Sequence, residues 1–329
     1  MLISMNIKSE NTVCEICKSD NISITGGGYD YEFKTSGNYW RTCCCNQCGH
    51  LYLNPRPKVS EAKKIYPDNY YPAPDFSSWN TKFINRIRYF IERSRYANLS
   101  KYVTPEPCFV DIGAGDGRVL GYFRKIFSSN ARLVAVDFSV DPKTKQYFDN
   151  QSIEYVEGIA ENIDFEKIGV RADAVLLTQV IEHLWSPDVV LKKLVGVMKD
   201  SGVMFIETPN PNSFCMKFQG SKYWGGWHRP RHLNVFSKES LVTLANRAGL
   251  NLVEYSQFTV PAFWIMGFRN RRGIPTYSTD SGWNKIVSIR SLPALIFFTL
   301  LEHIVGIFGL GRSNHRFVFI KQHEKKCVR

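Results

Sequence analysis

Four cysteines near the start of the chain have the spacing of a metal site. Cys14 and Cys17 form one CxxC pair, and Cys45 and Cys48 form a second pair after 27 intervening residues. Each pair places two thiolates on one tight turn, and two such turns supply the tetrahedral set that zinc prefers. Because four thiolates leave no open coordination position, the pattern predicts structural zinc. Redox chemistry is the weaker alternative, since no strand–CxxC–helix pattern surrounds either pair.

A glycine-rich turn is the second feature with chemical meaning. Asp111, Gly113, Gly115 and Gly117 alternate there, between an apolar run and a helical stretch. Glycines let a backbone turn sharply and approach a ligand closely, and a helix that begins there offers unpaired N–H groups. The dinucleotide fingerprint requires a further glycine where this chain has Arg118. The turn therefore indicates a nucleotide-like ligand other than a dinucleotide, with a purely geometric role as the alternative.

A carboxylate follows this turn at the spacing of a ribose-binding acid. Asp137 ends the next apolar run, 20 residues beyond Gly117. A carboxylate in that place can accept both ribose hydroxyls of a bound nucleoside. The turn and the acid together favour a cofactor with an adenosine end and a cationic centre but no pyrophosphate.

Two histidines are candidates for a general base, since an imidazole titrates near neutral pH. Glu182 and His183 follow an apolar run at 174–178 that predicts a strand, and His232 lies further along the chain. In an open parallel sheet, ligands lie beyond the carboxyl ends of the strands. We therefore predict Glu182, His183 and His232 as catalytic residues. A structural hydrogen bond is the alternative for either histidine.

Alternating apolar and amphipathic segments predict the elements that position these groups. An α/β fold with a doubly wound, mostly parallel sheet of seven strands follows from the alternation. The predicted strands are Cys108–Asp111, Leu133–Asp137, Ile153–Val156, Ala174–Thr178, Val203–Thr208, Leu252–Ser256 and Phe317–Lys321. The predicted helices are Val119–Phe127, Pro142–Asp149, Pro187–Met198 and Lys238–Ala248.

Composition divides the chain into three zones. Residues 1–54 hold most of the cysteines and form the predicted zinc ribbon, and residues 55–104 form a helical linker. Residues 105–329 form the α/β domain, in which residues 259–315 are a variable insertion with an apolar helix at 292–310. Glu302 and His303 lie inside that helix, which therefore fits a core or interface helix best, then a membrane-surface helix, and a membrane span least.

Charge and cysteine use limit the partners and the compartment. The chain has 329 residues and a formal net charge of +12, which favours anionic partners such as phosphorylated small molecules, a membrane surface or nucleic acid. The first ten residues lack the layout of a signal peptide. Several cysteines without an export signal indicate a reducing compartment. We therefore expect a cytoplasmic protein, with a peripheral membrane contact as an addition.

The motifs, taken in order, resemble those of class I S-adenosylmethionine-dependent methyltransferases, which have a Rossmann-like sheet. The run from Asp111 to Gly117 is similar to their first motif, and Asp137 matches their ribose-binding acid. Ala160 and Glu161 resemble the loop that contacts adenine. The resemblance implies S-adenosylmethionine as cofactor, bound by these residues and by Gln179.

The segment from Gln179 to His183 resembles the fourth-strand motif, which often ends in Glu-His in this superfamily. In relatives of the ubiquinone O-methyltransferases, that pair can take part in metal binding. Gln179 stands where some relatives have an extra acid, which weakens the case for carboxylate ligation here. Whether a second metal binds near His183 stays open at this point.

Two further resemblances concern the methyl acceptor. Residues 45–57 are similar to the zinc-ribbon front of bacterial methyltransferases that modify sugars and other small molecules. Residues 224–237 resemble a Glu-His stretch of sugar C-methyltransferases; His232 carries over, but Arg231 replaces the glutamate. O-methylation of a hydroxyl on a sugar, a glycan or lipid-linked precursor or a similar small molecule is therefore preferred, with histidine as base.

Three rival functions stay open. The first is C-methylation of a nucleotide-linked sugar. The second is rRNA methylation, which the small number of arginines and lysines in the ribbon disfavours. The third is a zinc-ribbon interaction protein that performs no chemistry.

Overall fold

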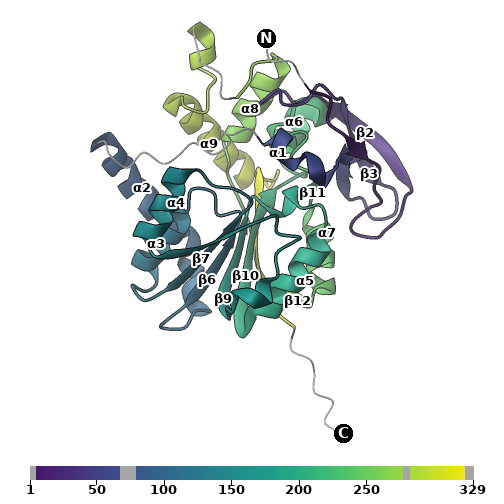
Figure 1. The fold of residues 1–329 in the computed structure, drawn as a ribbon. Coiled ribbons are helices and arrows are strands. Elements are labelled where there is room, and N and C mark those ends of the chain that lie inside the picture. The colour runs from purple at the N-terminus through teal and green to yellow at the C-terminus, as the bar shows by residue number, and fades with distance from the viewer. Residues whose placement is uncertain (1–4, 67–78, 277–281, 323–329) are drawn as a thin grey trace.

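A seven-stranded sheet lies at the centre of the computed structural model, which describes residues 5–66, 79–276 and 282–322 (Figure 1). The strand order is β12-β13-β10-β9-β6-β7-β8, and β13 is antiparallel to both of its neighbours. The strands are β6 (Cys108–Ile112), β7 (Arg132–Asp137), β8 (Ile153–Glu157), β9 (Ala172–Thr178), β10 (Met198–Pro209), β12 (Leu250–Phe258) and β13 (Asn314–Lys321). The predicted doubly wound, mostly parallel sheet is confirmed.

Both faces of this sheet are covered by helices, as the near-continuous apolar strands require. Alternate residues point to opposite faces: Val134 and Val136 belong to one core cluster, and Leu133 and Ala135 to the other. On one face lie α2 (Trp79–Tyr96), α3 (Arg118–Ile126) and α4 (Pro142–Asn150); on the other lie α5 (Pro187–Val197) and α7 (Lys238–Arg247) (Figure 1). The start of α4 shows how local sequence fixes a boundary, since the carboxylate of Asp141 accepts hydrogen bonds from two backbone N–H groups of the first turn.

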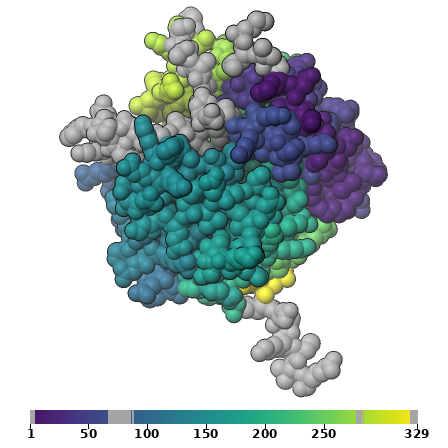
Figure 2. Space-filling model, viewed as in Figure 1, coloured from purple at the N-terminus to yellow at the C-terminus, as the bar shows by residue number. Residues whose placement is uncertain are grey.

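The N-terminal region forms a second sheet that is joined to the α/β domain. Its strands are β2 (Ile22–Gly28), β3 (Trp40–Cys45), β4 (Leu51–Leu53) and β11 (Asn234–Val235), in the order β11-β4-β3-β2. A separate pair joins β1 (Ser9–Glu10) to β5 (Arg56–Pro57). Because β11 comes from the chain beyond β10, the ribbon is seated directly on the α/β domain (Figure 2). A two-residue strand carries no periodicity, so the sequence could not predict this pairing.

The remaining helices gather at one end of the sheet. They are α1 (Ala62–Ile65), α6 (Phe214–Tyr223), α8 (Ala262–Arg271) and α9 (Leu292–Ile307). Short 3₁₀ turns occupy Val59–Glu61, Ala97–Lys101, Phe165–Ile168, Ile181–His183, Gly225–Trp227 and Gly282–Lys285.

Helix α9 turns Glu302 inward and His303 outward. Glu302 is 1% exposed and accepts hydrogen bonds from Trp264 and Ser313, whereas Leu300, Ile304 and other apolar side chains of the helix are exposed. Among the described residues, no helix is long and apolar enough to cross a membrane. The predicted peripheral membrane contact would lie on the exposed face of α9, and it stays a prediction.

Stability is expected to fall in mild acid because of His315 on β13. This imidazole is buried and contacts the hydroxyl of Tyr255, and burial lowers its pKa to about 4. The unfolded chain takes up this proton near pH 6.5, so between these values the unfolded state binds more protons and stability drops as the pH falls. We expect a loss of about 2 kcal/mol between neutral pH and about pH 5, measured by urea denaturation.

The matched variants for this measurement are His315→Gln and His303→Gln. The first removes the buried group and should reduce the dependence on pH by about 2 kcal/mol without abolishing it, because burial also lowers the pKa of His183 and His232. The second removes an exposed histidine on α9 and serves as the control. Equal slopes for the wild type and His315→Gln would contradict the assignment.

Candidate functional site

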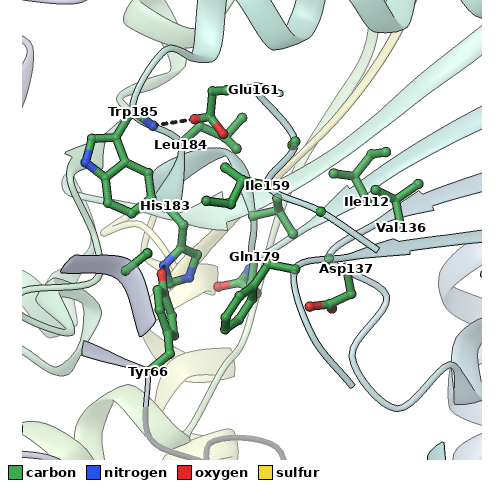
Figure 3. A pocket seen from close by; sticks show the side chains of 16 residues that line it. Tyr66, Ile112, Val136, Asp137, Ile159, Glu161, Gln179, His183, Leu184 and Trp185 are labelled. Atoms are coloured by element: carbon green, nitrogen blue, oxygen red, sulfur yellow. Dashed lines mark hydrogen bonds between the residues drawn. The ribbon is translucent and has the colours of Figure 1, made fainter. Parts of the chain in front are cut away.

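A cavity of about 680 Å³ opens at the carboxyl ends of β6, β7, β8 and β9, and we call it the glycine-turn cavity (Figure 3). Its walls are mostly apolar, with Ile112, Val136 and Ile159 among the lining residues. The side chains of Asp137 and His183 also line it. A mostly apolar cavity with the Asp137 carboxylate in its wall fits an adenosine, because the base needs apolar contacts and the ribose needs a hydrogen-bond acceptor.

The glycine turn forms one edge of this cavity. Gly113, Gly115 and Gly117 all have positive φ, at 68°, 55° and 67°, which explains why the chain has glycine there. A side chain at Gly113 would also collide with Val180. Gly113 lines the cavity, whereas Gly115 and Gly117, like Asp111, are not among the lining residues.

Asp137 connects the turn to the cavity. Its carboxylate accepts a hydrogen bond from the backbone N–H of Gly115 at 2.8 Å while it lines the cavity. Burial raises the pKa of Asp137, and burial together with the charge of Asp137 raises the pKa of Asp111 to about 8. Asp137 is therefore the carboxylate placed to meet a ligand, and Asp111 lies behind it in the strand.

The opposite edge comes from the segment after β8. Ala160 and Glu161 line the cavity. The Glu161 carboxylate accepts hydrogen bonds from the backbone N–H groups of Trp185 at 2.7 Å and Ser186 at 3.3 Å, the first drawn in Figure 3. This residue thus holds the segment that leads into α5 against the cavity wall.

Gln179 lies between two hollows of the surface. It follows β9 with a positive φ of 57°, and its backbone N–H donates to the carbonyl of Glu207. It lines the glycine-turn cavity and also a second, wider depression next to β13. Its buried side-chain Nε2 has no hydrogen-bond partner among the residues described. An amide in this place can contact ligands from both sides.

The two predicted histidines lie together, with ring centroids 4.5 Å apart. The Nδ1 atom of His183 is 3.1 Å from the carbonyl oxygen of Arg231 and 2.9 Å from the hydroxyl of Tyr66. Because a carbonyl only accepts, Nδ1 carries the proton and Nε2 keeps its lone pair. Burial lowers the pKa of His183 to about 3, so the ring is neutral at physiological pH.

His232 also has its Nδ1 against a backbone carbonyl, but its ring is more deeply buried. Its Nδ1 donates to the carbonyl of Gly226 at 2.8 Å, and burial lowers its pKa well below the usual value. It is 4% exposed and is not among the residues lining the glycine-turn cavity, whereas His183 is. His183 is therefore the histidine that a ligand in this cavity can reach.

Glu182 completes a cluster with the two histidines. It is fully buried, and one carboxyl oxygen accepts a hydrogen bond from Thr208 at 3.0 Å. The other, Oε1, has no hydrogen-bond partner among the described residues and lies 3.9 Å from Nε2 of His232. Burial raises the pKa of Glu182 to about 8. One ligand atom each from Glu182, His183 and His232 lie within 4.8 Å of one another, a donor set that suits a divalent cation.

Two arginines of the loop at 224–237 contact the N-terminal ribbon. The Arg231 guanidinium is fully buried and pairs with Asp30 of the ribbon at 3.0 Å. Arg229 donates to Thr42 of the ribbon. These basic groups hold the ribbon to the α/β domain.

The four predicted cysteine ligands converge in the ribbon. Cys14 Sγ is 3.5 Å from Cys48 Sγ, and Cys17 Sγ is 3.4 Å from Cys45 Sγ. All four sulfur atoms lie within 4.8 Å of one another. Tetrahedral zinc, with Zn–S bonds of about 2.3 Å, separates its sulfur ligands by roughly 3.8 Å. The cluster therefore fits zinc.

Comparisons with known proteins show the family to which this chain belongs. A family model described as "Methyltransferase domain" matches residues 83–255, just over half of the chain. The chain therefore belongs to the methyltransferase domain family. The family match and strand order confirm the resemblance found in the motifs.

Among curated proteins, the chain is similar to ubiquinone biosynthesis O-methyltransferases. It is 24% identical over 194 residues to the mitochondrial one of Dictyostelium discoideum, covering 50% of this chain and 60% of the relative. It is 30% identical over 135 residues to that of Rhodopseudomonas palustris (strain TIE-1), covering 39% of this chain and 51% of the relative. The chain thus spans about half to 60% of the length of these relatives.

Among solved structures, one similar chain is the 1,6-didemethyltoxoflavin-N1-methyltransferase of Burkholderia thailandensis, solved with 1,6-didemethyltoxoflavin and S-adenosylhomocysteine. It has a TM-score of 0.49 and 14% identity, with 83% of this chain and 96% of that chain covered.

Two parts of the site were not predicted from sequence. Tyr66 contacts His183 across 117 positions of the chain, and nothing in its proline-rich surroundings indicates that contact. Arg312, Asn314 and Arg316 line the second depression. Their alternation directly before an apolar strand was a usable signal, because every second residue of a strand shares a face.

Proposed function

We propose that the chain transfers a methyl group from S-adenosylmethionine to a hydroxyl of a small molecule, such as a sugar, a glycan or lipid-linked precursor. The observation that carries this proposal is the place of Gln179, which lines both the glycine-turn cavity and the adjoining depression. A cofactor in the first and an acceptor in the second would meet beside this residue. Similarity to O-methyltransferases supports the choice of a hydroxyl.

In this proposal, Asp137 holds the ribose hydroxyls and the apolar walls of the cavity hold the adenine. Gly113, with the turn shaped by Asp111, Gly115 and Gly117, allows the close approach of the cofactor. Ala160, Glu161 and Gln179 line the remaining edges. When bound, the sulfonium supplies an electrophilic methyl group, so the protein has mainly to orient the acceptor and take up its proton.

His183 is the proposed base. Its Nε2 lone pair is available because Nδ1 is held as a donor, and the ring lines the cavity four residues from Gln179. With the cofactor and acceptor bound, Nε2 of His183 would take up the proton that the acceptor hydroxyl loses on methylation. His232 and Glu182 lie behind His183 and position it.

A divalent cation on Glu182, His183 and His232 is the second candidate for activating the hydroxyl. The partnerless Oε1 of Glu182 and the convergence of the three ligand atoms favour it. Metal analysis of the purified chain separates the candidates. One metal ion per chain, from the cysteine site alone, supports the base, whereas two ions, with activity lost on removal of the second, support the cation.

C-methylation, rRNA methylation and a role without chemistry have less support. C-methylation has less support because Arg231 stands where the sugar C-methyltransferases have a glutamate. The Arg231 side chain is paired with Asp30. An rRNA methyltransferase would carry nucleic acid through purification, seen as absorbance at 260 nm with steep salt dependence. A protein without chemistry would bind cofactor but turn over no acceptor.

Titration calorimetry with S-adenosylhomocysteine tests the proposed function at its first step. We expect binding at one site per chain. Absence of binding would refute the proposal.

Zinc in the ribbon is part of the same proposal, and its removal should lower the thermal stability of the whole chain. Cys48→Ser is expected to lose about one zinc ion per chain and to lower the melting temperature by several degrees, because β4 of the ribbon pairs with β11 of the α/β domain. Metal analysis and thermal unfolding measure both effects. The control is Cys44→Ser, a neighbouring cysteine outside the cluster. A Cys48→Ser protein with wild-type zinc content would contradict the assignment.

A further inference from the structure

The depression beside Gln179 combines apolar walls with polar side chains, as a binding site does, and we call it the β13 depression. It is wide, with a volume of about 2000 Å³ that includes open solvent. Its walls come from α2, α8 and α9 and from the ends of β12 and β13. Phe90, Phe258 and Phe263 give these walls an apolar surface.

Three polar side chains at the start of β13 line this depression. They are Arg312, which lies just before the strand, and Asn314 and Arg316, which alternate along the strand and so share one face. The residues between them are used elsewhere: Ser313 donates to Glu302, and His315 contacts Tyr255. The alternation therefore separates the polar groups of the depression from those that hold the fold.

Asn314 is the strongest sign of a ligand. It is 1% exposed, yet neither its Nδ2 nor its Oδ1 has a hydrogen-bond partner within the part of the chain that the structure describes. Thr259 directly follows Phe258, the β12 residue paired with Asn314, and its buried hydroxyl also lacks a partner there. Buried polar groups are costly when unsatisfied, so both groups fit a site that a ligand completes.

The arginines around the depression indicate that the ligand carries a negative charge. Arg95 and Arg316 share the buried carboxylate of Glu207, and Arg95 also pairs with Glu92. Arg312 forms no ion pair or side-chain hydrogen bond with any described residue. Arg312 is therefore the guanidinium of the depression that a ligand anion can pair with.

We propose that the β13 depression binds an oxyanion of the methyl acceptor, a carboxylate or a phosphate, on Arg312 and Asn314. The fork of the Arg312 guanidinium matches two oxygens of such a group, and the Asn314 amide donates to it. The aromatic walls contact the body of the acceptor, which extends toward Gln179 with its hydroxyl. This inference rests on the proposed function, since it names the class of acceptor for the same site.

The test uses three small probes that share one aromatic body. Benzoate carries a carboxylate, phenyl phosphate carries a phosphate, and benzamide is the neutral counterpart. Titration calorimetry of the full chain is expected to show one or both anions binding about tenfold or more tightly than benzamide, as removal of a charge-assisted pair predicts. The stronger of the two anions tells which oxyanion the acceptor carries.

Two variants locate the binding. Arg312→Gln and Asn314→Leu should each reduce the preference for the anion to about threefold or less, while Arg290→Gln, an exposed arginine outside the depression, should retain it. Anions that bind no better than benzamide, or a preference that survives Arg312→Gln, would overturn the inference. S-adenosylhomocysteine is titrated into the same proteins. Its binding without anion preference refutes the oxyanion site alone, and its failure to bind refutes the proposed function.

Discussion

Asp137→Ala is expected to weaken the binding of S-adenosylhomocysteine by about 100-fold or more. The carboxylate lines the glycine-turn cavity and is the acceptor proposed for two ribose hydroxyls. Loss of two hydrogen bonds to a charged group corresponds to about 3 kcal/mol or more, and about 1.4 kcal/mol is tenfold in affinity. The variant also frees the N–H of Gly115, which donates to Asp137 at 2.8 Å, so the turn itself becomes less rigid. Titration calorimetry measures the change in affinity.

The control is a carboxylate at the same level of the next strand. Glu157 of β8 is paired in register with Asp137 but is exposed and does not line the cavity. Glu157→Ala should bind S-adenosylhomocysteine within about twofold of the wild type. Thermal unfolding of both variants shows that each is folded at the assay temperature. A folded Asp137→Ala protein with wild-type affinity would show that the nucleoside binds elsewhere.

His183→Ala is expected to lower the turnover number by about 100-fold or more, the usual contribution of a general base. The imidazole is neutral, and the ring lines the cavity where the methyl group would be delivered. The cofactor affinity should change much less, because the ribose and adenine contacts are made by other residues. Single-turnover assays with labelled S-adenosylmethionine and an accepted substrate measure the chemical step.

Tyr66→Phe is a milder variant that tests the same assignment of His183 as the base. It removes only the hydroxyl that lies 2.9 Å from Nδ1 of His183, while the hydrogen bond to the carbonyl of Arg231 stays. We expect a loss of activity of about tenfold or less. If His183→Ala keeps most of its turnover while Tyr66→Phe is inactive, the base assignment is wrong and the tyrosine has a larger role.

The sheet was predictable because its strands are buried on both faces. β6, β7 and β9 are apolar runs bounded by turn residues, and each agrees with its prediction within one or two residues. β10 begins earlier than predicted, at Met198 rather than Val203, since residues 199–202 between them carry no apolar signal. Glycines with positive φ after β6 also follow directly from the sequence.

Contacts between distant segments were not predictable. Arg231 belongs to the loop that resembles a stretch of the sugar C-methyltransferases, but its partner Asp30 lies 201 positions away in the ribbon. The sequence places Glu302 within an apolar helix but does not show that its side chain is buried, because its partners Trp264 and Ser313 come from other elements. The grouping of Glu182, His183 and His232 was not predictable either, because only the fold brings residue 232 beside residue 183.

A crystal structure of the chain with S-adenosylhomocysteine tests the central claim most directly. The account predicts that both ribose hydroxyls lie within hydrogen-bond distance of the Asp137 carboxylate, with the adenine among Ile112, Val136 and Ile159. The sulfur would point toward Gln179 and the β13 depression. Nucleoside density outside the glycine-turn cavity, or a sulfur directed away from Gln179, would contradict it.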